Sequence, residues 1–67
     1  MNRNLLLAKI KENDMTQRSV AASIGLSENT FTSRVNGRTP FSILEVQKMC
    51  SILHIADDAE KVRIFLS

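Results

Sequence analysis

Residues 16–36 read TQRSVAASIGLSENTFTSRVN, and two short helical segments flank Gly25 within this stretch. Thr16 and Ser27 are of the type that caps helix N-termini, because their hydroxyl oxygens accept hydrogen bonds from free backbone N–H groups. Gly25 permits the left-handed backbone conformation that ends many helices. Ala21 has almost no side chain, so a second helix can approach the first one closely. The stretch therefore predicts a helix, a glycine turn and a second helix that cross at a wide angle.

Similar signals divide the rest of the chain. Ser42 and Glu45 have the spacing of a capping box, and Asp57 with Glu60 has a similar spacing. Gly37 is a second candidate for the end of a helix. The helices predicted in this way run from about Asn4 to Asn13, from Thr16, from Ser27, from Ser42 and over about 57–66. No segment alternates with period 2 for long enough to form a strand, so we expect an all-α fold, a compact bundle of five short helices.

Apolar residues recur at helical spacing, and they predict which face of each helix is buried. Phe31 and Val35 lie one turn apart and pin the second helix of the 16–36 stretch to the core. The other expected core positions are Leu6, Leu7, Ile10, Met15, Val20, Ala21, Ile24, Leu26, Ile43, Val46, Met49, Cys50 and Leu53.

A length of 67 residues and a net charge of +2 restrict the class of protein. We expect one domain over residues 1–67, because 43% hydrophobic residues suit a small helical core rather than a disordered chain. The single cysteine, Cys50, excludes an internal disulfide and is typical of a reducing, cytoplasmic setting. The apolar run at 5–8 is too short for a signal-peptide core or a membrane span, so a soluble intracellular protein is expected.

With Phe31 and Val35 turned inward, the segment after Ser27 presents short polar side chains to solvent. Amide, carboxylate and hydroxyl groups of this kind can pair with base edges in the DNA major groove. The expected base-contacting residues of this segment are Glu28, Asn29, Thr32 and Ser33. The expected phosphate-contacting residues are Gln17, Arg18, Ser27, Arg34, Asn36 and Arg38. The pattern therefore predicts a helix-turn-helix over about 16–36 that binds double-stranded DNA.

The segment from Gln17 to Gly37, with the Arg-Thr-Pro-Phe-Ser that follows it, resembles the Cro/lambda-repressor-like (Xre) helix-turn-helix family. Residues 35–41, Val-Asn-Gly-Arg-Thr-Pro-Phe, are similar to small Cro-like phage regulators of Gram-positive bacteria. The resemblance covers roughly residues 5–66. It implies a five-helix domain that binds operator DNA, usually as a dimer on paired half-sites.

The resemblance also implies roles for individual residues. These are a backbone and outer-base contact by Gln17, base reading by Glu28 and Asn29, and a groove-facing position for Ser33 beside Thr32. The backbone amides after the recognition helix often clamp a phosphate in this family, and Asn36, Gly37 and Arg38 occupy that place. Many relatives pair an Arg in the first helix with a Glu late in the recognition helix, where this chain has Ile10 and Val35. This apolar pair favours the Cro-like phage branch, because packed apolar residues can replace a buried ion pair without loss of stability. Glu28 repels phosphates, so it is either a base reader or an acid that suits the helix N-terminus.

The segment 62–67 is unusually apolar for a chain end. It either folds back on the core through Val62 and Leu66, or meets a second copy of the chain through Ile64, Phe65 and Leu66. We favour a dimer contact, because half-sites one helical turn apart require a two-fold protein.

The remaining reactive residues have structural explanations. His54 has no second ligand at metal spacing. Asp57, Asp58 and Glu60 suit a helix N-terminus, and they lack the glycine of a calcium loop. No nucleophile, base and orienting group occur together, and there is no phosphate loop. We therefore expect no enzyme activity, no metal or other cofactor, no small-molecule ligand and no membrane partner.

The leading hypothesis is a sequence-specific transcriptional regulator, a phage or prophage Cro-like repressor that binds a palindromic operator as a homodimer. An alternative is a protein-interaction module of the same fold, such as an antitoxin or an antirepressor, which Glu28 and the modest net charge favour. An activator or excision factor is a further alternative, because the sequence does not give the position of the operator.

Overall fold

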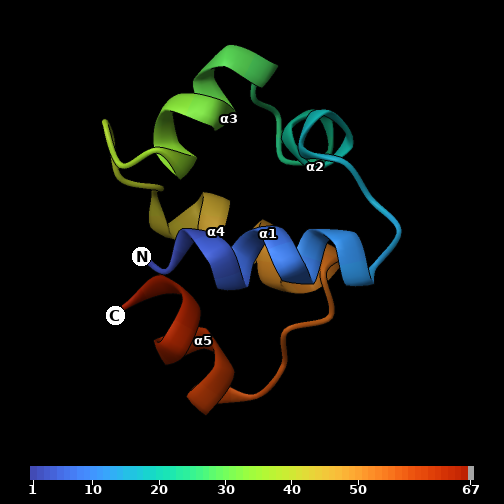
Figure 1. Ribbon diagram of the computed structural model, residues 1–67, viewed down its shortest axis with the longest axis vertical. Coiled ribbons are helices and arrows are strands. Elements are labelled where there is room, and N and C mark those ends of the chain that lie inside the picture. The colour runs from blue at the N-terminus through green and yellow to red at the C-terminus, as the bar shows by residue number, and fades with distance from the viewer. Residues whose placement is uncertain (67) are drawn as a thin grey trace.

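Five helices make up most of the computed structural model, which describes residues 1–66. They are α1 (Arg3–Glu12), α2 (Gln17–Ser23), α3 (Glu28–Val35), α4 (Ile43–Ile52) and α5 (Asp58–Phe65). In Figure 1, α1 crosses the middle of the molecule, α2 and α3 lie above it, and α5 lies below it. The all-α fold of five helices is confirmed, and none of the described residues forms a strand. Ser67, the last residue of the predicted domain, lies outside the described residues.

The predicted N-caps begin their helices as expected. The side chains of Thr16, Ser27 and Ser42 each accept a hydrogen bond from the backbone N–H three residues later. At Ser42 the reciprocal bond is also present, because the Ser42 N–H donates to Glu45 Oε1 at 2.9 Å. The box expected at Asp57 and Glu60 is wrong. Asp57 accepts from the N–H of Ala59, whereas Glu60 reaches α1 instead.

Four of the helices end in the same backbone arrangement, in which a residue with positive φ follows the C-cap. Gly25 and Gly37 hold this position after α2 and α3, each with φ 81°, as the sequence predicted. Asp14 and His54 hold it after α1 and α4, with φ 56°. In each case two backbone N–H groups donate to carbonyls of the last turn, which is the Schellman pattern. The two non-glycine ends were not predicted, since L-residues rarely adopt this conformation.

The core is built from the apolar faces of all five helices. Its buried members are Leu6, Ile10, Val20, Ala21, Ile24, Phe31, Val35, Met49, Leu53, Ile55 and Ile64. The apolar stripe predicted for α4 is wrong at one position, because Ile43 is 78% exposed. Ile43 precedes the buried Met49 by six residues and so lies about 120° away from it around the helix. Val46 and Cys50 pack at the edge of the core.

Contacts to α1 hold α5 in place. The Asn2 N–H donates to the Ile64 carbonyl at 2.6 Å, and Lys9 Nζ lies 3.3 Å from Glu60 Oε2. Desolvation lowers the pKa of Lys9, but the hydrogen bond to Glu60 and the nearby charge of Glu12 together raise the pKa above its ordinary value. The sequence did not predict this link between α1 and α5.

Burial corrects the predicted dimer contact. Ile64 is only 2% exposed in the chain's own core, so it is not available to a second copy. Phe65 packs against the core at its edge, and Leu66 is 78% exposed. The fold-back through Val62 and Leu66 does not occur either, because Val62 is 50% exposed. Among the residues of α5, Ile64 is the one that is buried in the core. None of the described helices has the length and the apolar character that crossing a membrane requires.

Candidate nucleic-acid interface

The contact between α2 and α3 sets the position of the outward face. Ala21 is 1% exposed, and its lack of a long side chain allows α3 to pack closely on α2. The turn at Gly25 brings Leu26 against the core before Ser27 starts α3. Phe31 is fully buried, and its ring centroid lies 5.6 Å from that of Phe41, in the segment after α3. The contact between the two rings thus holds the buried face of α3 against the segment that follows the helix.

The solvent-facing part of α3 carries the predicted base-contacting residues. Glu28, Asn29 and Thr32 are exposed, and Ser33 is half-buried. Their spacing places Asn29 and Ser33 on the side of the helix that faces away from Phe31 and Val35, and Thr32 at the flank of that side. Glu28 lies in the first turn, three residues before Phe31, and is exposed because it stands at the end of the helix. A shallow hollow of about 320 Å³ lies beside this face and is lined by Asn29, Thr30, Ser33, Arg34 and Thr39. The helix therefore presents a continuous polar surface with amide, hydroxyl and carboxylate groups.

Glu28 has a partner that the sequence did not reveal. Its Oε1 atom lies 4.0 Å from Arg18 Nε across the α2–α3 junction, and both side chains are largely exposed. Such a surface pair is weak and is screened by salt. The pair nevertheless places the positive charge of Arg18 beside the Glu28 carboxylate, which by itself would repel DNA phosphates. Gln17, half-buried at the first position of α2, lies next to Arg18 at the free backbone N–H groups of that helix.

Ser27 is engaged in its own helix cap. Its Oγ accepts from the Thr30 N–H at 3.2 Å and donates to Thr30 Oγ1 at 2.9 Å. The hydroxyl proposed for a phosphate contact is therefore already donating within the chain.

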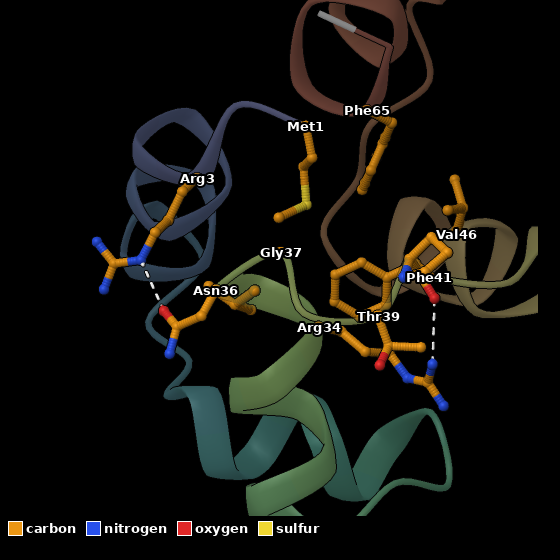
Figure 2. Close-up of a pocket in the computed structure, with 11 residues that line it drawn as sticks. Met1, Arg3, Arg34, Asn36, Gly37, Thr39, Phe41, Val46 and Phe65 are labelled. Carbon is orange, nitrogen blue, oxygen red and sulfur yellow. Dashed lines mark hydrogen bonds between the residues drawn. The ribbon is translucent and has the colours of Figure 1, made fainter.

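The role predicted for Arg34 needs correction. Its side chain is 20% exposed, and its Nε lies 3.3 Å from Glu45 Oε1. Its Nη1 donates to the Pro40 carbonyl at 3.1 Å, the contact drawn in Figure 2. The guanidinium therefore holds the segment between α3 and α4 and is not free to meet a phosphate. The sequence did not predict the Arg34–Glu45 ion pair, because the two residues lie on different helices.

The expected backbone clamp after α3 is also corrected. The N–H groups of Asn36, Gly37 and Arg38 donate to Thr32, Arg34 and Ser33 carbonyls, respectively, at 2.9–3.1 Å. All three amides are hydrogen-bonded within the helix end, so they are not available to a phosphate. The Arg38 side chain remains exposed.

Arg3 is a cation that sequence reasoning missed at this end of α3. Its Nε donates to Asn36 Oδ1 at 3.3 Å, and both residues are exposed. Figure 2 shows Arg3 reaching from α1 toward Asn36 beside a pocket of about 460 Å³. Arg3 and Arg38 therefore both lie near the C-terminal end of α3, although the sequence separates them by 35 positions.

Comparison with known families agrees with this geometry. The family model for the Cro/C1-type HTH DNA-binding domain matches residues 6–56. The chain belongs to this family. The match runs from within α1 to the segment before α5. No curated protein and no solved structure matches the chain.

Burial bears on the internal pair at which the resemblance implied a difference from many relatives. Ile10 and Val35 are each 3% exposed and belong to one core cluster. The sequence-based interpretation of this pair as apolar packing is thus consistent with the burial of both residues. Among residues 1–66, no three His, Cys, Asp or Glu side chains are grouped as a metal site would require.

Proposed function

We propose that this Cro/C1-type domain is a sequence-specific, double-stranded DNA-binding transcriptional regulator. The observation that carries the proposal is the polar face of α3, where Asn29 and Ser33 lie opposite a buried Phe31 and Thr32 lies at the flank. A helix held in this way at a close α2–α3 junction has the shape and side chains that enter the major groove.

Each exposed residue has a proposed role. Asn29 hydrogen-bonds an adenine edge, while Glu28 accepts from a cytosine amino group or keeps Arg18 in place. Thr32, Ser33 and Gln17 make the other base contacts. Arg18, Asn36 and Arg38 hold the phosphate backbone, and Arg3 joins them in place of Arg34. The single domain over residues 1–67 thus binds DNA through α2, α3 and the ends of the helices beside them.

We further propose that the regulator is a phage or prophage Cro-like repressor. Two copies on a palindromic operator place α3 of each in successive major grooves. The bound dimer represses by occupying a promoter and excluding polymerase, which requires no small-molecule ligand. Such a protein acts in the cytoplasm, where the DNA lies.

Selection of bound duplexes from a random pool tests this proposal, with the selected sequences titrated at several salt concentrations. We expect a palindromic consensus and a logarithmic salt slope that reflects the number of phosphate contacts. A matched pair of variants tests whether the polar face of α3 determines the consensus. Asn29→Ala on α3 should change the consensus, whereas Lys48→Ala should leave it unchanged, because Lys48 is an exposed residue of α4. Failure to enrich any sequence would overturn the proposal.

A protein-interaction module, either an antitoxin or an antirepressor, is the second candidate. The observation in its favour is Glu28, which is exposed on α3 and repels phosphates. This candidate predicts that Glu28→Gln leaves duplex binding negligible at every salt concentration. The DNA-binding proposal predicts salt-dependent binding by both the parent protein and this variant.

A further inference from the structure

Arg18 and Glu28 face each other across the junction of α2 and α3, which pack side by side in Figure 1. Arg18 is the second residue of α2, and Glu28 is the first residue of α3. Arg18 Nε lies 4.0 Å from Glu28 Oε1, and the two side chains are 83% and 56% exposed, respectively. Glu28 immediately precedes Asn29, so the pair brings the Arg18 guanidinium to the end of α3 where the proposed base contacts begin.

We propose that Arg18 reads a guanine in the major groove and that Glu28 positions it for this contact. This assignment rests on the proposed operator binding through α3. It adds a base contact to a residue for which the sequence predicts a phosphate contact. On non-specific DNA, Arg18 meets a phosphate, whereas at the operator Glu28 holds the guanidinium toward the bases.

The geometry of the pair favours a guanine. Glu28 lies on the Nε side of the Arg18 guanidinium, which leaves the two amino groups, Nη1 and Nη2, for a second partner. Two parallel N–H donors match the O6 and N7 acceptors of guanine, and this is the commonest specific contact of arginine in the major groove. The first residues of a recognition helix lie over base edges, so an arginine held there is directed at bases.

The charge of Glu28 gives a reason for Arg18 to leave the phosphates. A carboxylate at the start of α3 attracts the guanidinium toward the groove. In the free protein this attraction is weak, because both side chains are exposed and solvent screens the pair. It becomes stronger when α3 enters the groove and displaces water, because a lower dielectric constant strengthens the interaction between charges. Glu28 therefore acts on Arg18 mainly in the complex.

The pair also matches the edge of one particular base pair. A G·C pair presents the two acceptors of guanine beside the amino donor of cytosine. Arg18 offers only donors and ionised Glu28 offers only acceptors, so the two side chains together complement this edge. A contact of Glu28 to cytosine and its contact to Arg18 are then compatible at one base pair. We therefore expect a G·C pair close to the base pair that Asn29 contacts.

Duplexes that contain 7-deazaguanine test the contact, because this base pairs with cytosine but lacks the N7 acceptor. Selection from a random pool first gives the operator, and each guanine of the consensus is then replaced singly. We expect one guanine in each half-site, close to the base pair that depends on Asn29, where the replacement weakens parental binding about tenfold. Arg18→Ala should bind the two duplexes equally. Arg38→Ala is the matched control, since it also loses an exposed arginine but should retain the parental ratio of affinities.

Variants of Glu28 test the positioning role. Glu28→Ala removes the repulsion of phosphates, so it should bind both duplexes more tightly than the parent does. It should nevertheless lower the ratio between them by about threefold, because Arg18 is no longer held. Glu28→Gln retains an acceptor oxygen for Arg18 and should recover part of the ratio. An acid that only suits the helix N-terminus would leave the ratio unchanged in both variants, and this result would overturn the role of Glu28.

The same measurements separate this assignment from the proposed function. A consensus without a guanine close to the Asn29 position, or an Arg18→Ala variant that keeps the parental ratio, overturns the guanine contact and leaves operator binding intact. A random pool that yields no enriched sequence overturns operator binding itself, and the guanine contact with it. Circular dichroism confirms that each variant is folded.

Discussion

Arg34 and Glu45 join the end of α3 to the start of α4, with Arg34 Nε 3.3 Å from Glu45 Oε1. The same carboxylate oxygen accepts the Ser42 N–H at 2.9 Å, and Arg34 Nη1 donates to the Pro40 carbonyl. The ion pair and these two hydrogen bonds together tie the segment between the two helices to both of them. Its side chains are 20% and 15% exposed, so solvent screens the pair less than a surface one.

Glu45→Ala should lower the free energy of unfolding by about 1–3 kcal/mol, because it removes the capping bond at Ser42 and leaves Arg34 unpaired. Glu45→Gln should cost less, since the amide oxygen still caps α4. Urea denaturation monitored by circular dichroism measures both. Equal stability of Glu45→Ala and the parent would show that the segment is held by other contacts.

Arg38→Ala and Arg34→Ala should separate a phosphate contact from a structural one. Arg38 is exposed, so its loss should weaken binding to all duplexes alike and reduce the logarithmic salt slope by about one. Arg34→Ala should instead reduce stability, because Arg34 bonds within the chain. Salt titrations and urea denaturation on both variants check this. A reduced salt slope for fully folded Arg34→Ala, with none for Arg38→Ala, would reverse the two roles.

Asn29→Ala should cost about 1–3 kcal/mol of binding free energy at one base pair of each half-site and relax the preference there. Asn29 is exposed on the α3 face, so the stability of the protein should change little. Competition binding with duplexes altered at single positions identifies the base pair. If the preference at every position is retained, the proposed docking of α3 is wrong.

His54→Gly should stabilise the protein by about 1 kcal/mol, because His54 has φ 56° and glycine adopts this conformation without strain. Gly25→Ala should destabilise it by about 1–2 kcal/mol, even though no atom lies within 4 Å of the added Cβ. Thermal denaturation of both variants gives the comparison. We expect the two variants to change the stability in opposite directions. A Gly25→Ala variant as stable as the parent would contradict the argument that positive φ strains a residue other than glycine.

Cys50 should make the stability fall at alkaline pH. Burial raises the pKa of its thiol above the ordinary value of 9.0, so the folded state favours the neutral form. As the pH rises past 9.0, the thiol of the unfolded chain ionises first, and the free energy of unfolding decreases. Urea denaturation between pH 8 and pH 10 (about one unit on either side of the thiol's ordinary pKa) should show a smaller decrease for Cys50→Ala. An identical pH dependence in both proteins would assign the effect to other groups.

The sequence by itself determined the local features of this protein. Thr16, Ser27 and Ser42 were identified as caps, and Gly25 and Gly37 as helix ends, because each of these roles depends on backbone groups within one turn. The periodicity of the apolar residues likewise predicted the buried face of α3, and with it the outward position of Asn29 and Thr32.

The tertiary structure alone decided what depends on residues far apart in the chain. Arg34 became a structural residue because α4 brings Glu45 to it, and Glu28 gained Arg18 from the neighbouring helix. Packing against the other helices placed Met49 rather than Ile43 on the inward side of α4. It also placed Ile64 of α5 in the core and left Leu66 exposed. Spacing along one helix gives only relative orientation, and the direction that faces the core is set by the helices packed around it.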